Sequence, residues 1–297
     1  MSLVVGTAPD SWGVWYPEHP SQPPWSRFLD EAAAAGYRWI ELGPYGYLPT
    51  DEARLRDELG RRALSLIAGT LIDDLHIPSQ RDRVIERADA ICRLVAALGG
   101  KFLVLIANLY RVSRELTGPT ELDREQWREF IATTNEIGRR VRDEHGIVMT
   151  FHPHADTVVE YSRQVDRYLE DTDPDAVKLC LDTGHYEYRG GDSVELFRRE
   201  WPRIPYFHLK SVTSDAQRMA ADGFDFVHAV ALGAMCEPAA GVVDFAGLAG
   251  AMKEIGYQGW SIVEQDMFPL DDLGKPLPVA RRTREFFAKL GWSVDRR

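Results

Sequence analysis

The stretch VKLCLDTGH at residues 177–185 joins a short apolar run to a group of polar and ionisable residues. Its apolar part, Val177–Leu181, is typical of a strand that is buried on both faces, as in a parallel sheet. Similar runs recur along the 297-residue chain, with amphipathic segments between them. These runs are Leu3–Gly6, Trp39–Leu42, Ala63–Ala68, Phe102–Ile106, Ile147–Phe151, Ile204–Leu209 and Trp260–Val263. Together they predict eight strands, each followed by a helix.

The segments between the strands predict helices, several of which end at glycine, a favourable residue after the last helical turn. Arg83–Leu98 is a clear case, because its apolar residues recur at helical spacing up to Gly99. The other predicted helices are Trp25–Ala35, Asp51–Leu59, Glu125–Glu144, Arg163–Leu169, Val194–Glu200, Asp244–Ile255 and Pro278–Leu290. Eight such β–α units predict a single-domain α/β protein, a (β/α)8 TIM barrel over residues 1–297.

An open doubly wound sheet is the alternative architecture for this alternation. That fold often carries a Gly-rich phosphate-binding turn after its first strand. Here the first strand is followed by TAPDSW at residues 7–12, and the chain contains no G-x-G-x-x-G or Walker motif. The pattern therefore favours the barrel.

The connection between the seventh strand and its helix, residues 211–243, is unusually long. Long loops in a compact domain are usually functional. Because loops after barrel strands lie on the catalytic face, this one is predicted to form a lid or a pocket wall. An insertion without a functional role is the alternative.

The composition excludes several classes of partner. The chain has 35 Lys and Arg against 46 Asp and Glu, a net charge of −11, which opposes nonspecific binding to nucleic acid and to anionic membrane surfaces. No apolar run approaches the roughly 18 residues that span a bilayer, and the N-terminal residues do not resemble a signal peptide. Three widely separated cysteines, Cys92, Cys180 and Cys236, argue against a disulfide framework. We therefore expect a cytoplasmic protein.

Ionisable residues follow the last four predicted strands, at the end where barrel enzymes hold their active sites. In strand order these residues are His152, Asp182, His208 and Glu264. Two imidazoles and two carboxylates can bind Mn²⁺, Co²⁺, Zn²⁺ or Mg²⁺. The sequence therefore predicts a divalent metal site at the barrel mouth, although each residue alone is more often structural.

Other polar and aromatic residues are predicted to surround this site. His154 and Lys210 lie two positions beyond His152 and His208, so each should point the same way as its predecessor. Glu41 ends the second strand in the apolar setting WIEL, where a carboxylate is costly unless paired. We interpret Glu41 as a substrate-binding residue or as a partner of a site residue. The rim-loop aromatic residues Trp12 and Tyr45 are predicted to line this site, with core packing as the alternative.

The chain resembles the xylose-isomerase-like TIM-barrel superfamily, which includes sugar phosphate isomerases and epimerases, inosose dehydratases and the endonuclease IV branch. The segments that carry this resemblance are WIELGPYG (39–46), LDTGH (181–185), HLKS (208–211), GVVDF (241–245) and GYQGWSIVEQD (256–266). The resemblance implies that Asp182, His208 and Glu264 bind the metal. It also implies that His185, in the D-x-G-H motif, contacts the substrate.

The fifth strand departs from the pattern of the isomerases and epimerases. They commonly carry glutamate where this chain has His152, and their two metal-bound glutamates act as acid and base on opposite faces of the substrate. One of these carboxylates is therefore missing here. Inosose dehydratases, whose fifth strand is rich in histidine, resemble the chain better.

The resemblance implies chemistry at a carbon next to a ketone in a sugar, a cyclitol or another polyol. A divalent ion polarises the ketone, a base removes the α proton, and the resulting enediolate either expels a hydroxyl or is reprotonated. The candidate acid/base residues are Glu264, His154, His185 and Lys210. Elimination of water, as in inosose dehydratase, is our first hypothesis, and aldose–ketose isomerisation or ketose epimerisation is the alternative.

The sequence leaves two further functional classes undecided, and also whether the substrate is phosphorylated, which metal binds and whether the protein forms an oligomer. An endonuclease IV-like nuclease would need a fuller set of zinc ligands and a basic face, and a binding barrel without catalysis would need no metal. Arg189, beside Gly190 and Gly191, keeps a phosphorylated substrate possible. The identity of the metal and the presence of a homo-oligomer are likewise left open.

Overall fold

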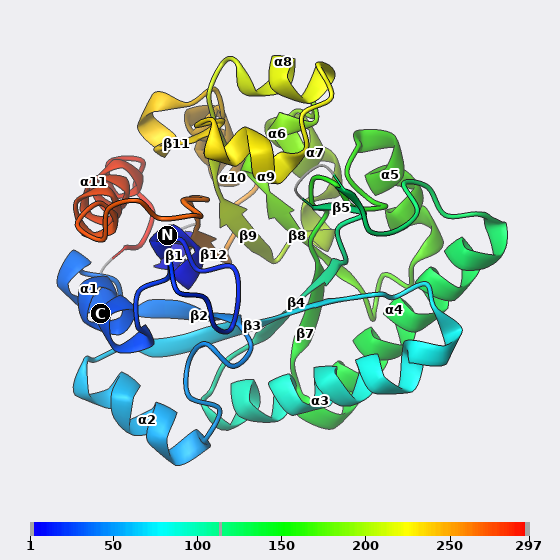
Figure 1. Cartoon of the computed structure of the whole chain (residues 1–297), viewed down its shortest axis with the longest axis horizontal. Helices are drawn as coiled ribbons and strands as arrows, with labels where there is room; N and C mark the ends of the chain where they lie inside the picture. Colours follow the sequence, from blue (N-terminus) through cyan, green and yellow to red (C-terminus); the bar gives the residue numbers. More distant parts are fainter. Residues whose placement is uncertain (1–2, 113–114, 295–297) are drawn as a thin grey trace.

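Eight parallel strands close into a barrel, and helices surround it (Figure 1). The computed structural model describes residues 3–112 and 115–294. Around the barrel the strand order is β1-β12-β9-β8-β7-β4-β3-β2, with β2 pairing back to β1. The barrel strands are β1 Leu3–Thr7, β2 Trp39–Pro44, β3 Ser65–Asp73, β4 Phe102–Ala107, β7 Val148–Phe151, β8 Lys178–Asp182, β9 Tyr206–Leu209 and β12 Gly259–Val263. The predicted single-domain TIM barrel is confirmed.

The outer helices lie where the amphipathic segments predict them. They are α1 Trp25–Ala35, α2 Glu52–Arg61, α3 Arg81–Ala97, α4 Arg124–His145, α5 Ser162–Asp171, α7 Ser193–Glu200, α10 Phe245–Glu254 and α11 Pro276–Lys289. A further short helix, α6 Thr183–Tyr188, begins directly at the end of β8. The last helix, α11, lies beside the first, α1, and this contact joins the two ends of the chain. No described helix combines the length and the apolar character needed to cross a membrane.

Residues 211–243 form a structured insertion rather than an irregular loop. It contains β10 Ser211–Val212, α8 Ala216–Ala221, α9 Phe226–Ala231 and β11 Met235–Cys236. Strands β10 and β11 pair antiparallel, and both short helices pack beside α6 and one another (Figure 1). A small hairpin, β5 Arg111–Val112 and β6 Glu115–Leu116, extends the loop after β4. The insertion shares a separate apolar cluster with α6, in which Phe226 and Val212 of the insertion join Tyr188 of α6.

A buried ionic cluster ties the loop after β7 to the insertion. The Arg189 guanidinium binds Asp156 Oδ1 at 2.6 Å and Glu160 Oε2 at 2.7 Å, and all three side chains are almost fully buried. Asp156 Oδ2 also accepts a hydrogen bond from the Phe226 backbone N–H at 2.5 Å. The Tyr110 hydroxyl donates to Glu160 Oε1 at 2.6 Å. Arg189 is thus engaged by two carboxylates and is not free to hold a phosphate.

Candidate active site

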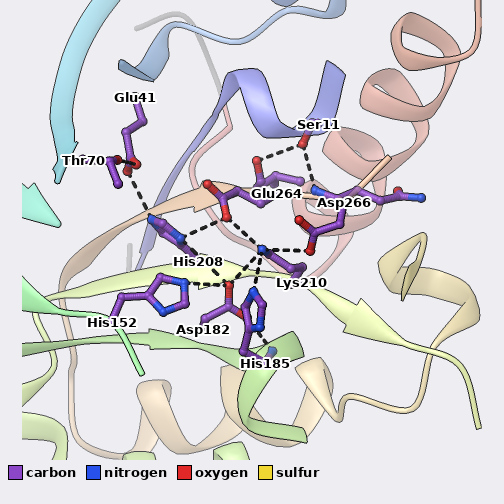
Figure 2. Close-up of polar contacts among 12 residues, drawn as sticks. Ser11, Glu41, Thr70, His152, Asp182, His185, His208, Lys210, Glu264 and Asp266 are labelled. Atoms are coloured by element: carbon purple, nitrogen blue, oxygen red, sulfur yellow. Dashed lines mark hydrogen bonds and ion pairs between the residues drawn. The ribbon is translucent and has the colours of Figure 1, made fainter. Parts of the chain in front are cut away.

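The four predicted metal ligands meet at the carboxyl ends of β7, β8, β9 and β12 (Figure 2). They are His152, Asp182, His208 and Glu264, and their ligand atoms all lie within 4.8 Å of one another. Strand register causes this meeting, because Asp182 on β8 pairs with His208 on β9. Glu264 follows β12, and its backbone N–H donates to Leu209 O at 3.2 Å.

The spacing and burial of these atoms suit a divalent ion. His152 Nε2 lies 3.3 Å from Asp182 Oδ2, and His208 Nδ1 lies 3.0 Å from Glu264 Oε2 and 3.9 Å from Asp182 Oδ2. A metal with bonds of about 2.1 Å separates neighbouring ligand atoms by roughly 3 to 3.5 Å. Asp182 Oδ2 and His208 Nδ1 are buried, and neither makes a well-formed hydrogen bond within the described residues. The two atoms lie 3.9 Å apart and have ionic contacts but no hydrogen bond of good geometry, so the residues present fit a metal.

Three residues of the motif LDTGH, Asp182, Thr183 and Gly184, each have a specific structural role. Asp182 Oδ1 caps α6 by accepting from the His185 N–H at 2.8 Å, which leaves Oδ2 for the site. The Thr183 hydroxyl donates to Lys210 O at 2.6 Å and so links β8 to β9. A Cβ on Gly184 would lie 2.5 Å from Lys210 Cβ, so glycine makes room for the lysine.

A second layer of ionisable side chains lies beside the four ligands. The Lys210 ammonium contacts Glu264 Oε2 at 3.0 Å, Asp266 Oδ2 at 3.1 Å and Asp182 Oδ2 at 3.3 Å, and it lies 3.2 Å from His185 Nε2 (Figure 2). The His154 ring lies against the His185 ring, with centroids 3.7 Å apart. The structure therefore brings all four candidate acid/base residues together.

Burial and neighbouring charge push the pKa values of this layer in opposite directions. Burial lowers the pKa of Lys210, but Asp182, Asp266 and Glu264 outweigh it and raise the pKa well above its ordinary value. Burial, His154 and Lys210 lower the pKa of His185 well below its ordinary range. Burial, together with His152 and Lys210, likewise lowers the pKa of His154 to about 3. Near neutral pH the site thus holds one ammonium beside two neutral imidazoles.

The two carboxylate ligands are held in their charged form. Burial raises the pKa of Asp182, but Lys210 and His152 outweigh it and lower the pKa to about 2. Burial also opposes ionisation of Glu264, while His208 and Lys210 lower its pKa overall. The two negative charges therefore favour a cation in this part of the site.

Glu41, Trp12 and Tyr45 were the remaining predicted substrate contacts. Glu41 lies beside His208, and its Oε2 is 3.2 Å from His208 Nε2 (Figure 2). Trp12 lies in the core, where its indole N–H donates to Glu31 at 2.8 Å and its ring packs on Phe28. Tyr45 packs against the main core as well. The structure brings neither Trp12 nor Tyr45 to the ionisable cluster.

Two residues of the site, Asp266 and Phe226, were not predicted from the sequence. Asp266 follows Glu264 by two positions, the same spacing that led to His154 and Lys210, so this signal was present in the sequence. Its Oδ1 accepts from the Trp15 indole N–H at 3.2 Å. Phe226 on α9 packs against the rings of His154 and His185, at centroid distances of 5.2 Å and 4.4 Å. Only the folded insertion brings Phe226 there, and no local pattern indicates it.

Comparison with known proteins agrees with this architecture. Inosose dehydratase from Lacticaseibacillus casei is 29% identical over 296 residues, which cover 96% of each chain. A solved structure of IolI protein with a zinc atom bound superposes with a TM-score of 0.71, at 15% identity and 98% coverage of both chains. A solved L-ribulose 3-epimerase superposes with a TM-score of 0.69, at 19% identity and 96% and 93% coverage. Residues 29–290 match the family described as xylose isomerase-like TIM barrel. The chain therefore belongs to the xylose isomerase-like TIM barrel family.

Proposed function

We propose that this protein is a divalent-metal-dependent enzyme that removes water from an inosose or a closely related polyol ketone. The observation that carries the proposal is His152 at the β7 corner of the cluster, where an epimerase would need a second glutamate. The nearly full-length similarity to inosose dehydratases supports the same choice. The zinc atom bound in the IolI structure, which shares this fold, is compatible with a metal-dependent function.

Four residues would hold the metal, namely His152, Asp182, His208 and Glu264. A bound divalent ion supplies a Lewis acid that polarises the ketone oxygen and so acidifies the adjacent C–H bond. Mn²⁺, Co²⁺, Zn²⁺ and Mg²⁺ are all compatible with two imidazoles and two carboxylates. The protein contributes a dry, fixed arrangement, because all four side chains are at most a tenth exposed.

His185 and Lys210 are the proposed base and acid of the elimination. Groups whose environments push their pKa values apart mark such a pair. His185, held neutral, accepts the α proton, and the electrons of that C–H bond form the new carbon–carbon double bond. The β carbon–oxygen bond then breaks, and the Lys210 ammonium protonates the departing hydroxyl to give water. His154 lies against His185 and holds or relays the proton, while Glu264 contacts Lys210.

A direct assay tests this function. Protein stripped of metal and reloaded with Mn²⁺ or Co²⁺ is incubated with scyllo-inosose, and the ultraviolet absorbance of the conjugated product is recorded. We expect absorbance to rise with the loaded enzyme and to stay flat in EDTA. Absence of this signal, together with turnover of a ketose, would refute the dehydratase.

Ketose epimerisation is the second candidate, because Asp266 supplies another carboxylate 3.1 Å from Lys210. Asp266 is a second carboxylate at the end of β12, in addition to Glu264, and both contact the Lys210 ammonium. The fold likeness to L-ribulose 3-epimerase is compatible with it. Incubation of ketoses in D₂O distinguishes the two reactions, because an epimerase incorporates deuterium at the epimerised carbon without loss of water.

The proposed substrate is thus a small sugar, cyclitol or other polyol rather than a nucleic acid, in keeping with the net charge of −11. The three cysteines are free thiols, which supports the proposed cytoplasmic location. Sedimentation of the purified protein tests whether the barrel forms a homo-oligomer.

A further inference from the structure

The Glu41 carboxylate is buried and surrounded by hydrogen-bond donors. Only 1% of the residue is exposed. Its Oε2 accepts from the Tyr206 hydroxyl at 2.8 Å and from His208 Nε2 at 3.2 Å, and its Oε1 accepts from the Thr70 hydroxyl (Figure 2). A carboxylate has about four acceptor positions. Three of these are used by the protein, which leaves little capacity for a substrate hydroxyl.

Contact with Glu41 decides which nitrogen of His208 faces the candidate metal position. The Nε2–H donates to the carboxylate, so the lone pair of Nδ1 points away from Glu41. That Nδ1 lies 3.0 Å from Glu264 Oε2 and 3.9 Å from Asp182 Oδ2. The partner of one ring nitrogen sets the tautomer and thereby the nitrogen that can bind a metal.

His152 is held in a comparable way by the backbone. Its Nδ1 lies 2.7 Å from Pro153 O, which leaves Nε2 facing Asp182 Oδ2 at 3.3 Å. The two histidines therefore present opposite nitrogens to the same centre. A carbonyl orients His152, whereas a charged carboxylate orients His208, so the second arrangement adds negative charge behind the ring.

Barrel closure brings Glu41 and His208 together. Glu41 lies on β2 and His208 on β9, and β1 and β12 separate these strands in the barrel order. The Glu41 side chain therefore crosses the barrel interior. Within residues 3–112 and 115–294, no lysine or arginine forms an ion pair with Glu41, and the basic side chain that contacts it is His208. Burying a carboxylate here costs free energy, and this cost is offset best when the imidazole that it contacts binds a cation.

We propose that Glu41 is a positioning residue for the metal: it fixes His208 in the Nε2–H tautomer and strengthens Nδ1 as a ligand. This inference rests on the proposed metal-dependent function. It replaces a substrate contact with a role exerted through His208. Carboxylates that hold metal-binding histidines typically change metal affinity by about 10- to 100-fold.

The test is calorimetric titration of Mn²⁺ into metal-free protein, which needs no substrate. We expect Glu41→Gln to weaken Mn²⁺ binding by about 10- to 100-fold. Thr70→Val, which removes one donor but keeps the charge, should weaken it by less than about tenfold. The Co²⁺ absorption spectrum is a second readout, because a change in the orientation of the His208 ring alters the ligand field.

The outcomes separate this inference from the proposed function. If the wild-type protein binds no Mn²⁺, the proposed function fails. If wild type and Glu41→Gln bind Mn²⁺ equally, the inference fails while the proposed function stands. A raised KM for inosose with unchanged Mn²⁺ affinity would show that Glu41 contacts the substrate, which also overturns the inference. Should Glu41→Gln not fold, Glu41→Asp, which keeps the carboxylate but shortens its reach toward His208 Nε2, is measured instead, and unchanged Mn²⁺ affinity there contradicts the inference.

Discussion

Asp182 shows how one side chain joins local structure to the site. Its Oδ1 caps α6, and its Oδ2 faces His152, His208 and Lys210. Asparagine accepts the same capping hydrogen bond, so Asp182→Asn separates the two roles. The cap survives in this variant, while one negative charge leaves the candidate metal centre.

We predict that Asp182→Asn folds but no longer responds to metal. Saturating Mn²⁺ stabilises wild type by about 2.7 kcal/mol at a hundredfold excess over Kd, whereas the variant should gain nothing. Thermal melts with Mn²⁺ and with EDTA measure this difference.

Asp89→Asn is the matched control, because Asp89 belongs to a separate group, with Glu144 and His145, that could hold an ion. Asp89 already binds Arg140 at 2.8 Å. The control should therefore keep the full Mn²⁺ response. If Asp89→Asn loses the Mn²⁺ response and Asp182→Asn keeps it, the ion binds at the Asp89 group and not at the proposed metal centre.

A pH-dependent contribution to stability is expected from His154. Its folded pKa of about 3 lies below the unfolded value of about 6.5. The unfolded chain therefore takes up a proton below pH 6.5 that the folded chain refuses, and stability is lost as pH falls. In EDTA, urea unfolding of wild type should lose about 1 kcal/mol more than His154→Gln between pH 7 and pH 5.5. Parallel pH profiles for the two proteins would contradict this assignment.

The ligand cluster could be predicted from the sequence, because parallel register aligns residues at the ends of neighbouring strands. Asp182 and His208 are such a register pair. The contact between Glu41 and His208 was not predictable, because it depends on side chains that meet across the barrel interior. Phe226 was missed for a similar reason, since only the folded insertion carries it to His154 and His185.

Among the elements, the insertion and the loop after β7 depend on one buried ion cluster. Arg189 forms ion pairs with both Asp156 and Glu160, and Asp156 also accepts a hydrogen bond from the Phe226 N–H at the start of α9. Burial raises the pKa of both carboxyl groups, although Arg189 opposes the rise. The cluster therefore helps to position Phe226 of α9 against His154 and His185.

Arg189→Gln should destabilise the protein by about 3–5 kcal/mol, because it leaves two buried carboxyl groups unpaired. Carboxyl groups with raised pKa values cost more stability as they ionise, so the loss should be larger at pH 8 than at pH 5. Urea unfolding at the two pH values measures both effects.

Arg163→Gln provides the control for this measurement. It breaks an ion pair with Glu121 in which both side chains are about three-quarters exposed. Such a surface pair should change stability by less than about 1 kcal/mol. A loss of equal size in Arg163→Gln and Arg189→Gln would contradict the role assigned to the buried cluster.

Regular elements were predictable where apolar periodicity is long or continuous, as in α3 and β4. β3 is observed at Ser65–Asp73 against the predicted Ala63–Ala68, because polar Thr70 and Asp73 follow the apolar run and hid its continuation. The six-residue helices α8 and α9 are too short for a helical period to stand out. Residues 211–243 were therefore predicted as a loop, although the structure orders them.

For the whole molecule, the closed barrel turns four separate strand ends into one centre. The number of β–α units predicts closure, and closure predicts that the last four strands adjoin one another. The bulk charge of −11 says little about the site, because Asp182 and Glu264 account for a small part of it. The sequence could not predict how far Lys210 reaches between those two carboxylates, since that depends on the space left by Gly184.

The most direct test of the metal centre is a crystal structure of Co²⁺-loaded protein with inosose, recorded at a wavelength where cobalt scatters anomalously. We predict one strong anomalous peak about 2.0 to 2.3 Å from His152 Nε2, Asp182 Oδ2, His208 Nδ1 and a Glu264 oxygen, with the ketone oxygen in an open position. A site without a peak, with the Lys210 ammonium still bridging Asp182 and Glu264 while Co²⁺ binds elsewhere, would contradict the proposed metal centre.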